Sequence, residues 1–165
     1  MELSHGVIVR KGWVVAKMSA PAQCTRPVRV VIVDDTPDLR ELMRLALTRG
    51  GMEVVGEAGD GLAGIEAVRL EHPDVVLLDL SMPVMDGLEA LPSIRSLVPA
   101  AKIIVFSGLG ATQMSERALA TGADGYVQKG MSLKRILDHV RDIVDGTADQ
   151  STPSLTVVPS LNREF

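Results

Sequence analysis

Four short apolar runs, each ending in a polar residue, constrain the fold of this 165-residue chain more than any other feature. The runs are residues 30–33 before Asp34 and Asp35, 75–78 before Asp79, 103–106 before Ser107, and 126–128 before Lys129. Continuous apolar runs separated by helix-like segments are typical of buried strands in a parallel sheet. The carboxyl ends of such strands meet at one edge of an open sheet, where ligands bind. We therefore expect carboxylates, a hydroxyl and an ammonium to converge in one small pocket.

The segments between these runs have the spacing of amphipathic helices, so strand and helix alternate five times along the chain. We predict strands over residues 28–33, 53–56, 74–79, 102–106 and 125–128. We predict helices between Thr36 and Gly50, between the turn at 59–61 and His72, and over residues 88–97, 112–121 and 132–144. This alternation predicts an α/β fold: a doubly wound, five-stranded parallel sheet with helices on both faces.

The start of the first helix carries the clearest local signal. Thr36 offers a hydroxyl cap, Pro37 suits the first helical position, and Asp38 places an acid in the first turn. The residues that would share the buried face of this helix are Leu39, Leu42, Met43 and Ala46.

One domain accounts for most of the chain, over residues 28–145. Residues 1–27 have no sustained period and are predicted to be an N-terminal extension and linker, with apolar runs at 7–9 and 13–16 compatible with a hairpin. Residues 146–165 are polar, and we expect them to form a disordered C-terminal tail. No second domain fits in that tail, so the sequence predicts a single stand-alone domain.

Charge and composition exclude several classes of function. A formal net charge of −4 argues against direct nucleic-acid binding, which needs a basic surface. No apolar stretch approaches the ~20 residues that span a membrane, so we predict no membrane association. Cys24 is the only cysteine. An internal disulfide is therefore impossible, and a reducing, cytoplasmic location is expected.

The polar residues at the predicted strand ends suit phosphoryl chemistry. Clustered carboxylates of Asp34, Asp35 and Asp79 favour a hard cation, and Mg²⁺ takes carboxylate and phosphate oxygens. Asp79, near the middle of the sheet, can act as a nucleophile toward phosphorus. Lys129 would neutralise phosphoryl oxygens, and the hydroxyl of Ser107 would donate to one of them.

These residues and their order resemble the receiver domain of two-component response regulators. The matching motifs, over about residues 28–144, are Val33-Asp34-Asp35, Leu78-Asp79 with Met82-Pro83 and Met85-Asp86-Gly87, Ser107-Gly108, and the run from Gly122 to Lys129. Many receivers have proline after the lysine, where this chain has Gly130. In this respect the chain is more similar to receivers that are attached to LuxR-type outputs.

The resemblance implies a flavodoxin-like receiver fold and a signalling role rather than an enzyme. Asp79 would accept a phosphoryl group from a histidine kinase or histidine phosphotransfer protein, with catalytic help from Ser107 and Lys129. Mg²⁺ would be held by Asp34, Asp35, Asp79 and the backbone carbonyl of Ser81. Ser107 and Tyr126 would form the switch pair. The surface formed by residues 112–121, 125–128 and 132–144 would change protein partners or mediate a homodimer.

Three other functions remain open on the sequence alone. A receiver-like docking module that is never phosphorylated would keep the fold and lose the chemistry. A small metal-dependent phosphatase of the haloacid-dehalogenase type would need a second Asp where this chain has Ser81, and a substrate cap. A flavodoxin-like nucleotide binder would need a loop rich in Gly, Ser and Thr after the first strand, where Asp34 and Asp35 stand.

Overall fold

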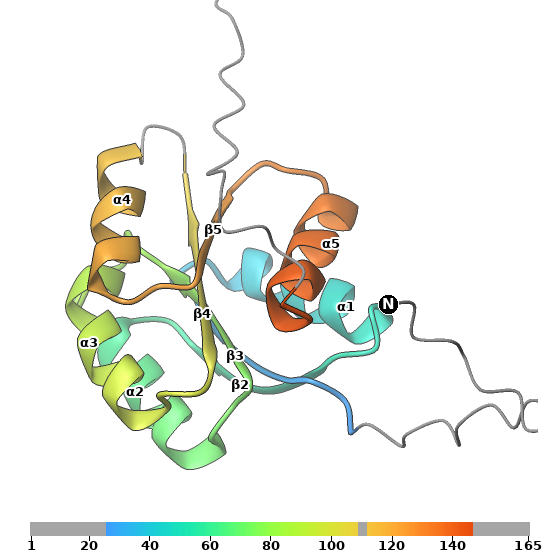
Figure 1. Cartoon of the computed structure of the whole chain (residues 1–165), viewed down its shortest axis with the longest axis horizontal. Helices are drawn as coiled ribbons and strands as arrows, with labels where there is room; N and C mark the ends of the chain where they lie inside the picture. Colours follow the sequence, from blue (N-terminus) through green and yellow to red (C-terminus); the bar gives the residue numbers. More distant parts are fainter. Residues whose placement is uncertain (1–25, 109–111, 147–165) are drawn as a thin grey trace, which may run out of the picture.

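The computed structural model describes residues 26–108 and 112–146, and side chains are described throughout except at residues 112–115. Five strands alternate with five helices in these ranges (Figure 1). In chain order the elements are β1 (Arg29–Val33), α1 (Pro37–Arg49), β2 (Glu53–Ala58), α2 (Gly61–Glu71), β3 (Val75–Asp79), α3 (Gly87–Leu97), β4 (Lys102–Ser107), α4 (Thr112–Thr121), β5 (Gly125–Gln128) and α5 (Leu133–Val144). The predictions for most of the extension and for nearly all of the tail lie outside the described residues.

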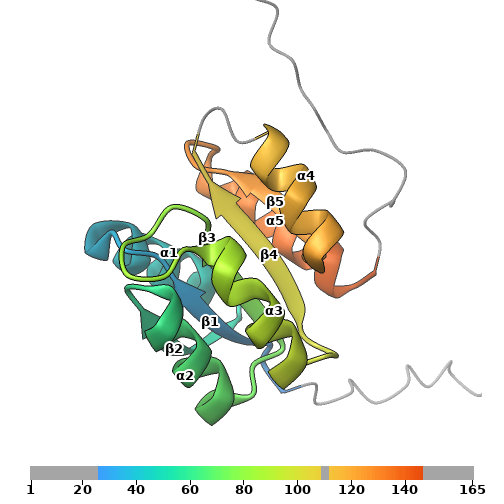
Figure 2. The same ribbon diagram turned by 90° about the vertical axis from the view of Figure 1, so that its left-hand side faces the viewer.

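All four strand pairs are parallel, in the order β2-β1-β3-β4-β5. Helices α1 and α5 cover one face of the sheet, and α2, α3 and α4 cover the other (Figures 1 and 2). The predicted doubly wound, five-stranded parallel α/β fold is therefore confirmed. None of the helices in the described ranges is long and apolar enough to cross a membrane.

The sheet separates two apolar cores because successive side chains of a strand point to opposite faces. On β1, Val31 and Val33 join the core under α2, α3 and α4, whereas Val30 and Ile32 join the core under α1 and α5. Both cores are made almost entirely of aliphatic side chains that are less than a tenth exposed. The strands at the centre are thus buried on both faces, as continuous apolar runs predict.

Strand β2 is longer than the sequence indicated. The prediction ended this strand at Gly56, but pairing with β1 continues to Ala58, opposite Val33. Gly56 lies inside the strand, paired with Val31, and a Cβ at this position would lie 3.3 Å from Cγ2 of Val31. The glycine thus accommodates close packing and does not break the strand.

Helix α1 corrects two of the local predictions. Pro37 is the first helical residue, as expected, but the Thr36 hydroxyl does not cap the helix; it lies 3.3 Å from Oδ1 of Asp35, to which it donates. The buried face is also rotated from the predicted one. Leu42 is 44% exposed, whereas Leu47 is fully buried and joins Met43 in the core under α1 and α5.

Candidate functional site

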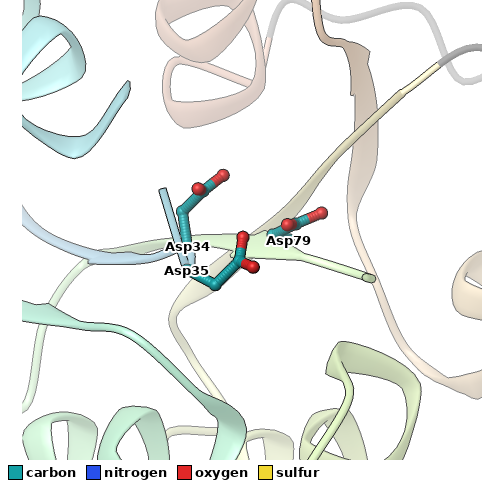
Figure 3. Close-up of side chains that lie close together, drawn as sticks. All are labelled: Asp34, Asp35 and Asp79. Carbon is teal, nitrogen blue, oxygen red and sulfur yellow. The ribbon is translucent and has the colours of Figure 1, made fainter. Parts of the chain in front are cut away.

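Three carboxylates meet at the carboxyl edge of the sheet. Asp34 and Asp35 follow β1 directly, and Asp79 is the last residue of β3, the strand that pairs with β1. Figure 3 shows their side chains gathered above these two strand ends. One oxygen from each of the three lies within 4.8 Å of the others. The convergence follows from strand order, because adjacent parallel strands end on the same side of the sheet.

The protein backbone fixes one oxygen of each buried acid. Asp34 and Asp79 are each only 2% exposed. Oδ1 of Asp34 accepts from the N–H of Thr36 at 2.8 Å, and Oδ1 of Asp79 accepts from the N–H of Ser81 at 3.1 Å. These local bonds close the turns that follow the two strands. The second oxygen of each carboxylate is thereby left for the pocket.

Lys129, the residue after β5, brings an ammonium to those second oxygens. Its Nζ is 2.8 Å from Oδ2 of Asp34 and 2.8 Å from Oδ2 of Asp79. Its backbone N–H donates to the carbonyl of Ser107 at 2.7 Å, and its Nζ lies 5.7 Å from the centre of the Phe106 ring. The ammonium is thus held between the ends of β1 and β3 from a strand at the far edge of the sheet.

Burial and charge shift two ionisable groups in this pocket. Burial raises the pKa of Asp79, and the nearby Asp34 charge adds to the rise, against the lowering effect of Lys129 and of the Ser81 N–H. The pKa of Lys129 is also raised, because the bonds and charges of Asp34 and Asp79 outweigh its own burial. Lys129 therefore stays protonated, and a buried Asp79 carries its charge at a cost.

The residues present fit a hard divalent cation. One ammonium faces three carboxylates, so negative charge remains in excess. Oδ2 of Asp34 has the Lys129 ion pair but not the geometry of a hydrogen bond, and among the described residues it is the buried side-chain atom that lacks one. An oxygen-only set with a buried acceptor that lacks a hydrogen bond is the donor chemistry that Mg²⁺ takes.

The remaining predicted residues occupy nearby positions, and their roles remain predictions. Ser107 ends β4 and is 3% exposed. Tyr126, on the neighbouring strand β5, packs against the core under α2, α3 and α4, and burial raises its pKa. Ser81 contacts the site through its N–H group.

The loop between β3 and α3 contains contacts that the sequence prediction missed. The N–H of Gly87 donates to the carbonyl of Leu80 at 3.2 Å, and a Cβ at Gly87 would lie 2.1 Å from the carbonyl oxygen of Asp79. Glycine is therefore required by the close approach of α3 to the end of β3. Asp86 and Glu89 form a capping box at the start of this helix. Their three-residue spacing was a readable signal.

Arg40 is a second residue that the sequence prediction missed. Its guanidinium Nη1 donates to the backbone carbonyl of Asp34, and its Nε lies 3.6 Å from Oε2 of Glu57 on β2. An arginine on the first turns of a helix has no sequence signature that distinguishes this contact from an ordinary surface ion pair.

Comparison with known proteins places the chain in a family. Residues 30–141 match the response regulator receiver domain, and the chain belongs to that family. It is 32% identical over 136 residues to a putative transcriptional regulator of Pseudomonas aeruginosa, covering 82% of this chain and 66% of that protein. It is 35% identical over 115 residues to the chemotaxis protein CheY of Thermotoga maritima, covering 70% of this chain and 96% of CheY.

Solved structures agree with this assignment. A CheX-CheY-BeF3-Mg²⁺ complex from Borrelia burgdorferi aligns with a TM-score of 0.68 and 28% identity, covering 71% of this chain and 89% of that one. LuxR-family response regulators are also among the similar structures, as the sequence resemblance implied. The chain spans 66% of its Pseudomonas relative and 56% of the transcription regulator BvgA.

Family membership sets the general role of the pocket. The chain is a two-component receiver domain with an acidic pocket formed by Asp34, Asp35 and Asp79 and completed by Lys129. Receiver domains are signalling phospho-acceptors and not classical enzymes, and they act by contacting kinases and other proteins. The expectation of a signalling module is therefore confirmed at this level.

Proposed function

We propose that Asp79 accepts a phosphoryl group from the phosphohistidine of a histidine kinase or histidine phosphotransfer protein, with Mg²⁺ bound in the acidic pocket. One observation carries the proposal: a buried carboxylate at the end of a central strand lies beside two further acids and contacts an ammonium at 2.8 Å. Phosphoryl transfer depends chiefly on positioning and charge stabilisation, and these groups supply both.

The chemistry follows from the groups present. A carboxylate oxygen of Asp79 forms a bond to phosphorus as the bond from phosphorus to the histidine nitrogen breaks, and the leaving imidazole nitrogen takes up a proton from water. Bound Mg²⁺ would neutralise charge on the phosphoryl oxygens; Asp34, Asp35, Asp79 and the Ser81 carbonyl would hold it. Lys129 would move its contact from the Asp79 carboxylate to a phosphoryl oxygen.

We propose that the neighbouring strands β4 and β5 transmit the effect of phosphorylation to the protein surface. The hydroxyl of Ser107 would donate a hydrogen bond to a phosphoryl oxygen, and Tyr126 would change its packing in response. The face formed by α4, β5 and α5 would then exchange protein partners or pair with a second copy of the chain. Sedimentation with and without phosphorylation tests the pairing: a mass that is unchanged on activation would exclude a phosphorylation-dependent homodimer.

The test of the main proposal is direct labelling. Purified protein is incubated with acetyl phosphate and Mg²⁺ and weighed intact, beside Asp79→Asn and a control, Asp138→Asn, which changes a half-buried acid on α5. We expect one phosphoryl group on the parent and on Asp138→Asn, none on Asp79→Asn, and loss of labelling on chelation of Mg²⁺. Failure with acetyl phosphate and with a phosphohistidine donor would refute the proposal and favour the unphosphorylated docking module.

A further inference from the structure

The backbone of Asp34 is fixed on both sides of its Cα atom. Its N–H donates to the carbonyl of Ala58, the last residue of β2, at 3.0 Å. Its carbonyl accepts from Nη1 of Arg40, which lies on α1 with its side chain only 20% exposed. The second contact acts on the peptide group that joins Asp34 to Asp35. This one peptide therefore links two of the three acids of the pocket.

The orientation of that peptide determines where Asp35 points. Asp34 is also held by its carboxylate, through the Thr36 N–H, so it has little freedom. Asp35 is exposed and lies beyond the end of β1. Rotation of the peptide before Asp35 would swing its Cβ atom away from the other acids, whereas the Arg40 bond opposes such rotation.

We propose that Arg40 is a positioning residue for the cation site, which holds the Asp34–Asp35 peptide so that both carboxylates face one ion. This inference rests on the proposed function, since it assumes that the acidic pocket binds Mg²⁺. Arg40 does not touch the ion. It acts as groups behind metal ligands do, by orienting ligands before the metal arrives, and loss of such groups typically weakens metal binding roughly 10–100-fold.

The sign of the effect separates positioning from simple electrostatics. Arg40 is a cation near a cation site, so its charge alone disfavours Mg²⁺, and a neutral side chain would strengthen binding. Its ion pair with Glu57, at 3.6 Å, offsets part of that charge. Positioning predicts the opposite result: a neutral replacement weakens binding because the peptide is no longer held.

Arg44 provides a matched control on the same helix. Its Nε lies 3.6 Å from Oε1 of Glu57, the same carboxylate that pairs with Arg40, and its Nη2 also contacts Glu41. Among the contacts of the described residues, none joins the Arg44 side chain to Asp34. Replacing Arg44 thus removes a guanidinium from the same network and leaves the peptide of Asp34 bonded.

The experiment measures Mg²⁺ affinity directly on metal-free, unphosphorylated protein. Backbone amide NMR shifts are followed during Mg²⁺ titration of the parent and of Arg40→Met, Arg40→Lys and Arg44→Met, with circular dichroism to verify folding. We expect Arg40→Met to bind Mg²⁺ about 10-fold more weakly, at the lower end of the typical range because loss of the positive charge offsets part of the effect, and Arg44→Met to stay within about twofold of the parent. Arg40→Lys keeps the charge but lacks the planar fork that reaches two partners, so it should also bind more weakly.

A second readout distinguishes positioning from general damage. At saturating Mg²⁺, Arg40→Met should be labelled by acetyl phosphate at nearly the parent rate, with the Mg²⁺ concentration for half-maximal rate shifted by the same factor as the affinity. Equal affinities for Arg40→Met and Arg44→Met, or tighter binding by Arg40→Met, would overturn the inference. Should the parent bind Mg²⁺ and resist phosphorylation, the phospho-acceptor proposal alone would fail. A parent that binds no Mg²⁺ would refute both.

Discussion

Replacement of Lys129 by methionine isolates the electrostatic cost of the pocket. Methionine has a similar length and fills the same volume, so the change removes the ammonium and little else. In the parent, this ammonium lies 2.8 Å from one oxygen each of Asp34 and Asp79, both 2% exposed. Without this ammonium and without Mg²⁺, the two buried carboxylates face each other with no cation between them. The exposed carboxylate of Asp35 adds a third negative charge nearby. We expect a loss of stability that depends strongly on pH.

Two limits bracket the size of this loss. At 2.8 Å and an effective dielectric constant of about 20, each ion pair has an attraction of about 6 kcal/mol. Desolvation offsets much of this attraction, so the first limit is the cost of breaking a buried pair, roughly 3–5 kcal/mol. The alternative for the folded protein is to protonate one carboxyl group. For an acid of ordinary pKa 3.8 this costs about 4 kcal/mol at about pH 7 and about 2 kcal/mol at about pH 5.

The loss of stability cannot exceed the smaller of these two costs. The raised pKa of Asp79 lowers the cost of protonation further. The side chain of Lys129 is 24% exposed, so water screens part of its contribution. We therefore expect Lys129→Met to lose about 2–4 kcal/mol at about pH 7 and no more than about 2 kcal/mol at about pH 5. Added Mg²⁺ should restore part of the loss at the higher pH, because a cation again faces the carboxylates.

The assay is urea unfolding followed by far-ultraviolet circular dichroism, in chelator and then in Mg²⁺. Lys134→Met is the control, since this side chain on α5 is 85% exposed and pairs with Asp138 one turn away; its loss should stay within about 0.5 kcal/mol at both pH values. A Lys129→Met variant that is as stable as the parent at about pH 7, or equally destabilised at both pH values, would refute the electrostatic account.

Three further perturbations test other contacts of the site by the same unfolding assay. Gly87→Ala should lose about 1–3 kcal/mol, because its Cβ would overlap the Asp79 carbonyl, whereas Gly108→Ala, with open space at Cβ, should not; equal losses would contradict this. Asp86→Ala should lose about 1 kcal/mol through its capping box, and Thr36→Ala clearly less, because the Thr36 hydroxyl makes no cap. The raised pKa of Asp79 favours folding in acid, and this contribution is lost as pH rises through the pKa of the folded protein. The free energy of unfolding of metal-free Asp79→Asn should therefore increase relative to that of the parent between about pH 4 and about pH 7. A difference that stays constant with pH would contradict this prediction.

The alternation of strands and helices was predictable because it depends on short-range sequence features. Continuous apolar runs mark strands that are buried on both faces, and right-handed crossovers leave few ways to arrange them. The acids after β1 and at the end of β3 therefore had to share an edge once the two strands were adjacent. Helix α4 and strand β5 were predicted at their observed bounds, Thr112–Thr121 and Gly125–Gln128.

What sequence could not provide are the contacts that depend on distances between elements. The Thr36 hydroxyl has two acceptable acceptors, a helix N–H and the Asp35 carboxylate, and the geometry of the pocket favours the second. The exposed side of α1 depends on how that helix packs against the sheet, which leaves Leu42 exposed and buries Leu47. The bond from Arg40 to the Asp34 carbonyl likewise requires the distance between α1 and the end of β1.

The pocket buries charged side chains, whereas the rest of the core is apolar. This burial of charge is the feature that indicates a function. A protein optimised for stability alone would not place Asp34 and Asp79 at 2% exposure with one ammonium between them. The hydrogen bonds from Thr36 and Ser81 reduce the cost but leave Oδ2 of Asp34 without a hydrogen bond. Stability is thus given up to keep acceptors ready for a cation. Asp34→Asn should accordingly stabilise the metal-free protein and weaken Mg²⁺ binding together, and a variant that improved both would show that the burial serves another purpose.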